Sequence, residues 1–288
     1  MYNTYKTLIG KNNYLFLIND SSKELEVHCN NLNLVEDKEL KRYNFKNYCL
    51  IVFPNKSFIY KDYLPENYSV KYRPALDTYI KVLLDKLIDT YNVLKNEKDI
   101  YYKTDTHINI KGSYIVYKYF IEELNKIYKL YIKPKKILIL SKKCILSELQ
   151  LGIGDLLWKQ NLGEQIIKDH TDTFYYSNEI KYIYCTHKIQ ISDKIKILNK
   201  DLIEQNNKLE DSIIDWNILT NYILYQKNIS DNKYKVLIFY DSFLCSTLSL
   251  YLELFEEVYM IKSIYNNNDI NIINPDYVFE FRVERFLF

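Results

Sequence analysis

Residues 234–244 read YKVLIFYDSFL, an apolar run that stops at Asp241-Ser242 and precedes a helical pattern from about 245 to 255. The run YCLIVF at 48–53 is likewise continuous, ends at a proline, and is typical of a strand buried in a parallel sheet. Strands that alternate with helices predict an α/β three-layer sandwich, in which helices cover both faces of a mostly parallel sheet. The other predicted strands are 14–18, 100–102, 258–261 and 277–281, and the other predicted helices are about 35–43, 74–94 and 112–127.

Length and patterning predict a single domain. The 288 residues, 48% of them hydrophobic, are enough to bury one full core. The alternation breaks between about 130 and 232, where shorter strand-like pieces lie among polar loops, and it returns at Tyr234. We therefore expect one domain over 1–288, with an insertion or subdomain at approximately 130–232.

Composition argues against several classes of protein. The formal charge is +2 and no basic block stands out, which disfavours a nucleic-acid partner. The N-terminus lacks the pattern of a secretory signal, and no apolar run reaches the roughly 18 to 20 residues that span a bilayer, so a cytoplasmic location is expected. The five cysteines are odd in number and have no paired or zinc-type spacing, which predicts reduced thiols and no metal site.

Two motifs follow predicted strands, where ligands of parallel sheets bind. The first is Asp105-Thr106-His107, and the second is Asp241-Ser242 at a strand-to-helix turn. Serine is a weak nucleophile that needs a base, and a histidine base needs a carboxylate to hold its tautomer. An isolated Asp-x-His is more often a cap or a surface pair, and Asp-Ser commonly begins a helix. Their joint placement favours a Ser-His-Asp site.

Six segments together carry a family resemblance. They are TDTHINIKGSY (104–114), FYDSFL (239–244), GKNNYLFLIND (10–20), LIVFPNKSFIY (50–60), Gly154-Asp155-Leu156 and NPDYVFEFRVERFL (274–287). In order and rough spacing over nearly the whole chain, they resemble the SGNH-hydrolase-like O-acetyltransferases of the alginate O-acetyltransferase group, the AlgX/AlgJ-like bacterial proteins that acetylate polysaccharide hydroxyls. The resemblance implies an SGNH-like fold, with Ser242 as nucleophile, His107 as general base and acid, and Asp105 as its orienting carboxylate.

The resemblance also implies substrates and partners. The expected activity is transfer of an acyl group, acetyl by that family's chemistry, to a carbohydrate such as a capsule or exopolysaccharide precursor. The donor would be acetyl-CoA or another acyl carrier, with no tightly bound cofactor and with an association to polysaccharide-biosynthesis machinery. Two departures stand out, because Tyr240 replaces a glycine of the motif and Ile108 replaces a tryptophan. Tyrosine narrows the backbone geometries available at the turn, and loss of the tryptophan removes a stacking surface for a sugar.

Further residues have two interpretations each. Asn19 and Asn55 are candidate oxyanion donors or ordinary turn residues, and Lys56 either binds an acidic group or lies on the surface. Tyr240 and Asp241 flank the nucleophile, and Asp241 most simply caps the helix that follows it. Two alternative functions remain open, a carbohydrate esterase with the same triad and a catalytically silent glycan-binding protein. Asp155 is expected at a helix start, and Arg285 is expected to orient a carboxylate or to pair with Glu284.

Overall fold

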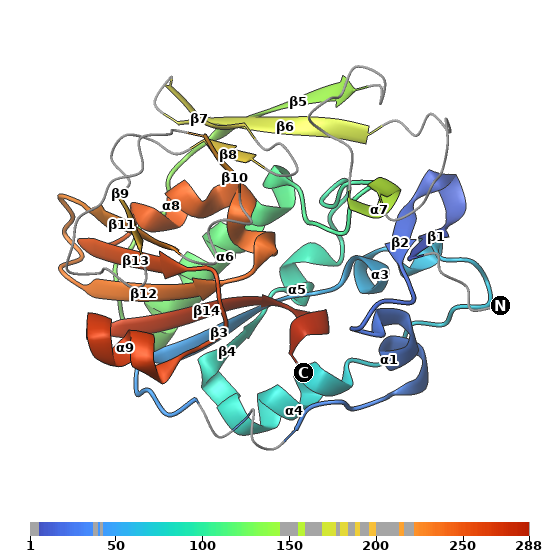
Figure 1. Ribbon diagram of the computed structural model, residues 1–288, viewed down its shortest axis with the longest axis horizontal. Coiled ribbons are helices and arrows are strands. Elements are labelled where there is room, and N and C mark those ends of the chain that lie inside the picture. Colours follow the sequence, from blue (N-terminus) through green and yellow to red (C-terminus); the bar gives the residue numbers. More distant parts are fainter. Residues whose placement is uncertain are drawn as a thin grey trace.

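A seven-stranded sheet forms the centre of the molecule, in the order β4-β3-β14-β12-β13-β11-β9 (Figure 1). The computed structural model describes residues 6–36, 40, 43–144, 155–158, 169–176, 179–183, 188–190, 196–199, 213–215 and 222–287. The five strands from β4 to β13 run parallel, whereas β11 is antiparallel to both β13 and β9. The strands are β3 (Tyr48–Phe53), β4 (Leu87–Asp89), β9 (Lys196–Asn199), β11 (Tyr222–Lys227), β12 (Lys235–Tyr240), β13 (Glu257–Ile261) and β14 (Tyr277–Val283).

Helices cover both faces of this sheet, as Figure 1 shows. Successive side chains of a strand point to opposite faces. Ile51 and Phe53 of β3 therefore join the core beneath α6 and α8, while Leu50 and Val52 join the core beneath α4 and α9. Both faces are buried, which explains the continuous apolar runs and confirms the three-layer α/β prediction. The α-helices are α1 (Glu24–Asn30), α3 (Lys56–Ile59), α4 (Pro74–Leu83), α5 (Tyr91–Leu94), α6 (Ile110–Tyr128), α7 (Asp155–Trp158), α8 (Leu248–Leu252) and α9 (Asn267–Ile273).

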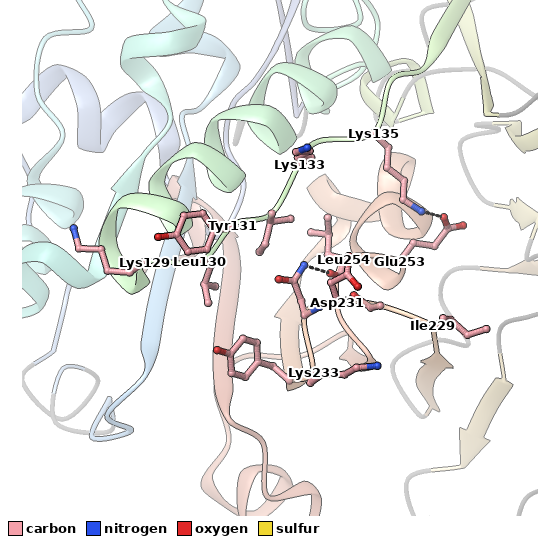
Figure 2. A pocket seen from close by; sticks show the side chains of 14 residues that line it. Lys129, Leu130, Tyr131, Lys133, Lys135, Ile229, Asp231, Lys233, Glu253 and Leu254 are labelled. Carbon is pink, nitrogen blue, oxygen red and sulfur yellow. Dashed lines mark hydrogen bonds and ion pairs between the residues drawn. The ribbon is translucent and has the colours of Figure 1, made fainter.

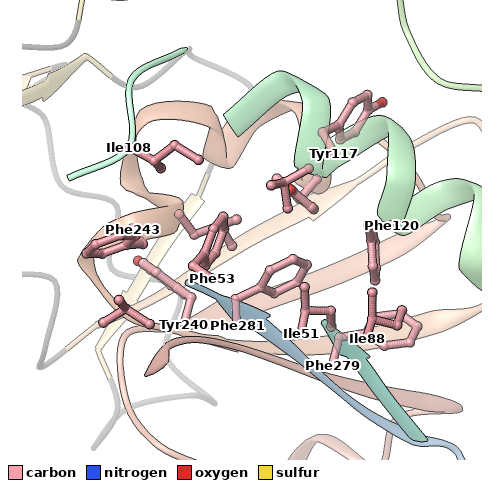
Figure 3. Packing of buried hydrophobic residues seen from close by; sticks show 14 of the residues in the cluster. Ile51, Phe53, Ile88, Ile108, Tyr117, Phe120, Tyr240, Phe243, Phe279 and Phe281 are labelled. Atoms are coloured by element: carbon pink, nitrogen blue, oxygen red, sulfur yellow. The ribbon is translucent and has the colours of Figure 1, made fainter. Parts of the chain in front are cut away.

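Helix α6 is held against the sheet by aromatic side chains (Figure 3). The ring of Phe120 meets the rings of Phe279 and Phe281 edge to face, with centroids 5.2 and 5.0 Å apart. The helix begins after Asn109, whose side chain accepts a hydrogen bond from the Gly112 N–H at 3.0 Å. This packing fixes the loop before α6 at the carboxyl end of the sheet.

Gly112 marks a close contact at the start of α6. A Cβ atom there would lie 2.5 Å from Cγ1 of Ile108 and 2.7 Å from the Ile100 carbonyl oxygen. We expect Gly112→Ala to lower the free energy of unfolding by about 1–3 kcal/mol, because overpacking outweighs the better helix propensity of alanine. Denaturant unfolding measures this change, with the exposed Lys111→Ala as a control expected within about 0.5 kcal/mol of the wild type. A Gly112→Ala protein as stable as the wild type would contradict the packing described.

The prediction of one continuous helix over 74–94 is wrong between residues 84 and 90, whereas both its beginning and its end are helical, in α4 and α5. Helix α4 ends at Leu83, and Leu84 has a positive φ of 51°. A 3-10 turn (η3, Leu84–Lys86) then leads into β4, which pairs in parallel with β3. Ile88 is buried in this strand, and the hydrogen bonds to β3 outweigh the helical spacing of the apolar residues.

The predicted insertion region contains several short strands. Within this region, β9 and β11 belong to the main sheet, and the other strands of the region form two small sheets. The extent of an insertion at 130–232 stays a prediction. In the part of the chain that the structure describes, no helix combines the length and the apolar character needed to cross a bilayer. The smaller sheets comprise β1 (Thr7–Ile9) with β2 (Leu15–Leu17), β5 (Leu138–Cys144) with β6 (Asp169–Tyr176) and β7 (Glu179–Ile183), and β8 (Lys188–Gln190) with β10 (Ile213–Asp215).

Candidate active site

Asp105 and His107 lie on a short buried loop at the N-terminus of α6. A bridge between Tyr101 and Ile108 closes this loop. Asp105 Oδ1 accepts a hydrogen bond from the His107 N–H at 2.8 Å, the i to i+2 pattern of an Asx turn. The same bend brings the imidazole back over the carboxylate, and both residues are buried. The two-residue spacing of the motif is therefore what the turn requires.

Ser242 lies at the turn after β12. It is the first residue of a 3-10 helix, η7 (Ser242–Thr247), that follows the end of the strand at Tyr240. Asp241 braces the turn, because its Oδ1 accepts from the Phe243 N–H at 2.9 Å and its Oδ2 accepts from the Val283 N–H at 2.6 Å. This agrees with the capping role expected for Asp241. Burial raises the pKa of its carboxyl group.

The two motifs meet as a hydrogen-bonded relay. His107 Nδ1 lies 2.5 Å from Asp105 Oδ1, and His107 Nε2 lies 2.7 Å from Ser242 Oγ. A carboxylate accepts hydrogen bonds, so Nδ1 carries the proton and Nε2 of the neutral ring accepts from the serine hydroxyl. Ser242 itself is half-buried. The arrangement can activate a serine nucleophile.

The charge of Asp105 stabilises the protonated form of His107. Burial is the largest single effect and disfavours an ionised group at both positions, but the attraction between Asp105 and an imidazolium, together with the hydrogen bonds that Asp105 accepts, outweighs it. The pKa of Asp105 is therefore held well below its usual range, and the pKa of His107 is raised. A proton that leaves Ser242 Oγ would be stabilised on His107 by the ionised carboxylate.

Asp155, the first residue of α7, supports the loop that carries Asp105 and His107. Its two carboxylate oxygens accept from the Thr106 N–H at 2.7 Å and the Thr106 Oγ1–H at 2.8 Å. Its own N–H donates to Asp105 Oδ2 at 3.0 Å. Asp105, His107 and Asp155 each offer a ligand atom within 4.8 Å of the others, a spacing that could hold a cation. Each group is already engaged by protein hydrogen bonds, so we assign the cluster to positioning the triad. Gly154, part of the Gly-Asp-Leu motif, lies outside the described residues.

Lys56 is neither a surface residue nor open to an acidic ligand. Its side chain is buried, and its Nζ donates to the carbonyl oxygens of Lys103 and Asp105 at 2.9 Å each. The ammonium also lies over the rings of Tyr14 and Phe16, 5.8 and 5.6 Å from their centroids. Lys56 therefore holds the loop of Asp105 in place, which corrects both interpretations made from the sequence.

Asn55 is oriented by a histidine that the sequence did not single out. The buried His28 has its Nδ1 2.6 Å from the Tyr72 carbonyl oxygen, so that nitrogen carries the proton. Its Nε2 then accepts from Asn55 Nδ2 at 2.8 Å, while Asn55 Oδ1 accepts from the Arg285 N–H at 3.3 Å. These bonds determine which end of the carboxamide is the donor. Asn55 follows the carboxyl end of β3, and Ser242 follows the carboxyl end of β12. Strand β14 lies between these two parallel strands, so both residues lie at the same end of the sheet.

The structure separates three other residues from the triad. Asn19 is exposed and lines a separate pocket with Lys23 and Glu26, so the structure gives it no place beside the triad. Tyr240 is buried in the core with Ile108 (Figure 3) and does not face a substrate. Among the described residues, those at 240–243 have no positive φ, so the turn does not require the glycine of the family motif. Ile108 packs against α6, so no sugar could stack at this position.

Glu24, Thr106 and Arg285 complete the polar surroundings of the triad. Arg285 Nη2 donates to Thr106 Oγ1 at 3.2 Å, and Arg285 Nη1 lies 3.5 Å from Glu24 Oε2. Arg285 therefore does not pair with Glu284, whose carboxylate instead binds Arg73 at 2.7 Å. The resemblance had included Arg285 in a motif, but no local sequence signal indicates Glu24 or His28.

A pocket of about 910 Å³ lies at the opposite side of the molecule from the triad, near the amino end of β12 (Figure 2). It is bordered by the end of α6 and by Tyr234, which immediately precedes β12. Lys129 and Lys133 line it, and Tyr131 at its border is 91% exposed. Among the described residues that line it there is no histidine to serve as a base. The triad therefore remains the candidate active site.

Comparison with known proteins supports the fold. No family model matches the chain, and no curated protein matches it in sequence. A DHHW family protein from Eubacterium siraeum is 14% identical, with a TM-score of 0.59 over 95% of this chain and 88% of that chain. PatB1 from Bacillus cereus, solved with a sulfonyl adduct, is 16% identical, with a TM-score of 0.61 over 99% and 97%.

The third comparison bears on the family resemblance. The O-acetyltransferase domain of Pseudomonas putida AlgJ is 12% identical, with a TM-score of 0.53 over 98% of this chain and 92% of that domain. At such identities the likeness is one of fold. The fold expected from the resemblance to the alginate O-acetyltransferase group is confirmed.

Proposed function

We propose that this protein is a serine-dependent O-acyltransferase that moves an acyl group, most simply acetyl, from an activated donor to a carbohydrate hydroxyl. The observation that carries the proposal is the relay from Asp105 through His107 to Ser242, with distances of 2.5 and 2.7 Å. The AlgJ domain of the same fold is an O-acetyltransferase, which supports the reaction type. The acceptor class rests on the motif resemblance.

The first half of the proposed reaction forms an acyl-serine. Ser242 Oγ attacks the donor carbonyl carbon while His107 Nε2 takes the hydroxyl proton. The Ser242 N–H, at the first position of η7, has no partner among the hydrogen bonds of the described residues and is one donor for the oxyanion. Asn55, held by His28 and the Arg285 N–H, is the candidate second donor. When the intermediate collapses, the donor's leaving group departs with the proton from His107.

The second half transfers the acyl group. The acceptor hydroxyl gives its proton to His107 Nε2 and attacks the acyl carbon, and Ser242 Oγ departs and takes that proton back. Acetyl-CoA or another acyl carrier would serve as donor, and the residues of the triad require no tightly bound cofactor. A carbohydrate esterase would use the same first half, with water in place of the acceptor.

The buried positions of Tyr240 and Ile108 bear on the alternative of a silent glycan-binding protein. That interpretation rested on their departure from the family motif. Tyr240 is 1% exposed and packs within the core, and the turn beside it has no strained backbone conformation. Ile108 is also 1% exposed. Neither residue obstructs the relay, so an active enzyme is favoured.

Intact-protein mass spectrometry after brief exposure to an activated acetyl ester tests the proposal. We expect the wild type to gain one acetyl-sized mass that maps to Ser242, because the relay makes this hydroxyl nucleophilic. Ser242→Ala and His107→Ala should gain none at that position. Adding carbohydrate acceptors should then remove the adduct with transfer to sugar, whereas loss to water alone would indicate an esterase. A wild type that acquires no Ser242 adduct would overturn the acyl-serine mechanism.

A further inference from the structure

Arg285 lies where three loops of the site converge. It belongs to the 3-10 helix η8 (Glu284–Phe286), which follows β14 directly. β14 lies between β3 and β12, so η8 begins between the loop of Asn55 and the turn of Ser242. Arg285 is only 6% exposed, and a charged residue is rarely buried this deeply unless it is paired.

Each loop of the site contacts a different part of Arg285. Its N–H donates to Asn55 Oδ1 at 3.3 Å, and its Nη2 donates to Thr106 Oγ1, in the middle of the Asp-x-His motif, at 3.2 Å. Its guanidinium carbon lies 5.1 Å from the centroid of the Phe243 ring, next to the nucleophile. The ring of Phe243 in turn lies 5.0 Å from the imidazole of His107. Arg285 thus joins all three loops, the Asn55 loop through its backbone N–H and the other two through its side chain.

The charge on Arg285 opposes the carboxylates around His107. Asp105 lies on the histidine's own loop and Asp155 faces it from α7, and both favour an imidazolium. Lys56 reaches the Asp105 carbonyl oxygen from α3, and Ser242 faces the ring from η7. Arg285 acts against the two carboxylates and lowers the pKa of His107.

Glu24 of α1 limits the effect of that charge. Its Oε2 lies 3.5 Å from Arg285 Nη1, and its Oε1 accepts a hydrogen bond from Ser57 Oγ. Glu24 is as deeply buried as Arg285, so the pair is shielded from solvent. Removing either partner should therefore change the field at His107, in opposite directions.

We propose that Arg285 is a positioning residue of the acyl-transfer site, which joins the Asn55, Thr106 and Phe243 loops and places one positive charge beside His107. The inference rests on the proposed function for its role in catalysis. The effect of the Arg285 charge on the protonation of His107 can be measured without turnover. His107 must be neutral to accept the serine proton, so activity falls as the pH drops through the pKa of His107.

The test is the acid limb of the pH profile for reaction with an activated acetyl ester. Arg285→Gln removes a positive charge, so the imidazolium is more stable and the limb should move up by about 0.5–1 pH unit. Glu24→Gln, which can still accept from Ser57, should move it down. The double variant should lie between the two, and Arg285→Lys, which keeps the charge, should stay near the wild type while losing rate.

Lys135→Gln is the matched control. It removes the same charge from a half-buried lysine that pairs with Glu253 and lines the pocket far from the triad. The acid limb of its pH profile should stay at the wild-type pH. Circular dichroism checks that each variant is folded. If Arg285→Gln does not fold, the downward shift of Glu24→Gln still tests the charge. A limb that stays at the wild-type pH in both variants, with only a lower plateau, would overturn the proposal.

Titration of His107 by nuclear magnetic resonance separates this proposal from the proposed function. The His107→Ala spectrum assigns the signal among the four histidines. The same opposite shifts for Arg285→Gln and Glu24→Gln are expected in this titration, whether or not Ser242 reacts. A wild type that is inert toward the ester, with the His107 shifts present, would count against acyl transfer and leave the electrostatic role supported. Absence of both shifts would refute the electrostatic role.

Discussion

Ser242→Ala is expected to lower the rate of acyl transfer by about 10⁴- to 10⁶-fold. The variant keeps the turn intact, because Asp241 and not Ser242 makes the bonds to the Phe243 and Val283 N–H groups. What it removes is the oxygen that lies 2.7 Å from His107 Nε2, so no acyl-serine can form. Steady-state release of alcohol from an activated acetyl ester, with and without a carbohydrate acceptor, measures the loss.

Ser246→Ala is the matched control for this experiment. Ser246 lies in the same 3-10 helix and its Oγ is 3.1 Å from Ser113 Oγ, away from the relay. The control should keep the wild-type rate to within a few-fold. If Ser242→Ala retained the wild-type rate while carbohydrate affinity were also unchanged, the serine ester would be excluded and a glycan-binding protein would be the better description.

Asp105→Asn should lower kcat by about 10⁴-fold, the order seen when an orienting aspartate of a serine triad is changed. Asp105 Oδ1 accepts from both the His107 N–H and Nδ1, and its Oδ2 accepts from the Asp155 N–H. An asparagine has one acceptor oxygen and a donor group in place of the other. An amide donor facing Nδ1 would place the imidazole proton on Nε2, where it cannot accept from Ser242.

Single-turnover acylation of Asp105→Asn isolates this step from deacylation. Asp155→Asn is the comparison, because Asp155 bonds to Thr106 and makes no hydrogen bond to His107 in the described structure. Its loss should be much smaller than that of Asp105→Asn. An Asp105→Asn variant that acylates within tenfold of the wild type would show that the carboxylate does not set the tautomer of His107.

Much of the fold could be predicted because its strands are buried on both faces. Residues 48–53 and 234–240 are almost wholly apolar, and such short runs are typical of strands in a parallel sheet that is covered on both faces. Residues 84–90 were predicted wrongly for the complementary reason. Their apolar spacing suits a helix, but β4 gains hydrogen bonds from β3 that no local pattern records. Pairing partners distant in sequence decided the outcome.

The triad could be predicted because each of its residues lies in a motif with a local structural cause. The Asp-x-His spacing is an Asx turn, and Asp241 caps the helix that begins at Ser242. Lys56 could not be placed in this way, since lysine is usually exposed and its burial here depends on carbonyl oxygens 47 and 49 residues away in sequence. His28 lies in an ordinary helix, and only the folded chain reveals that it orients Asn55.

The central position of β14 has a consequence for how the protein forms during synthesis. It follows both β3 and β12 in the sequence, yet it pairs with β3 on one side and β12 on the other. Until the ribosome has released this strand, β3 and β12 each present an open edge, and the loops of His107 and Ser242, 135 residues apart, have no common support. The nascent chain should therefore remain inactive until β14 has joined β3 and β12 in the sheet.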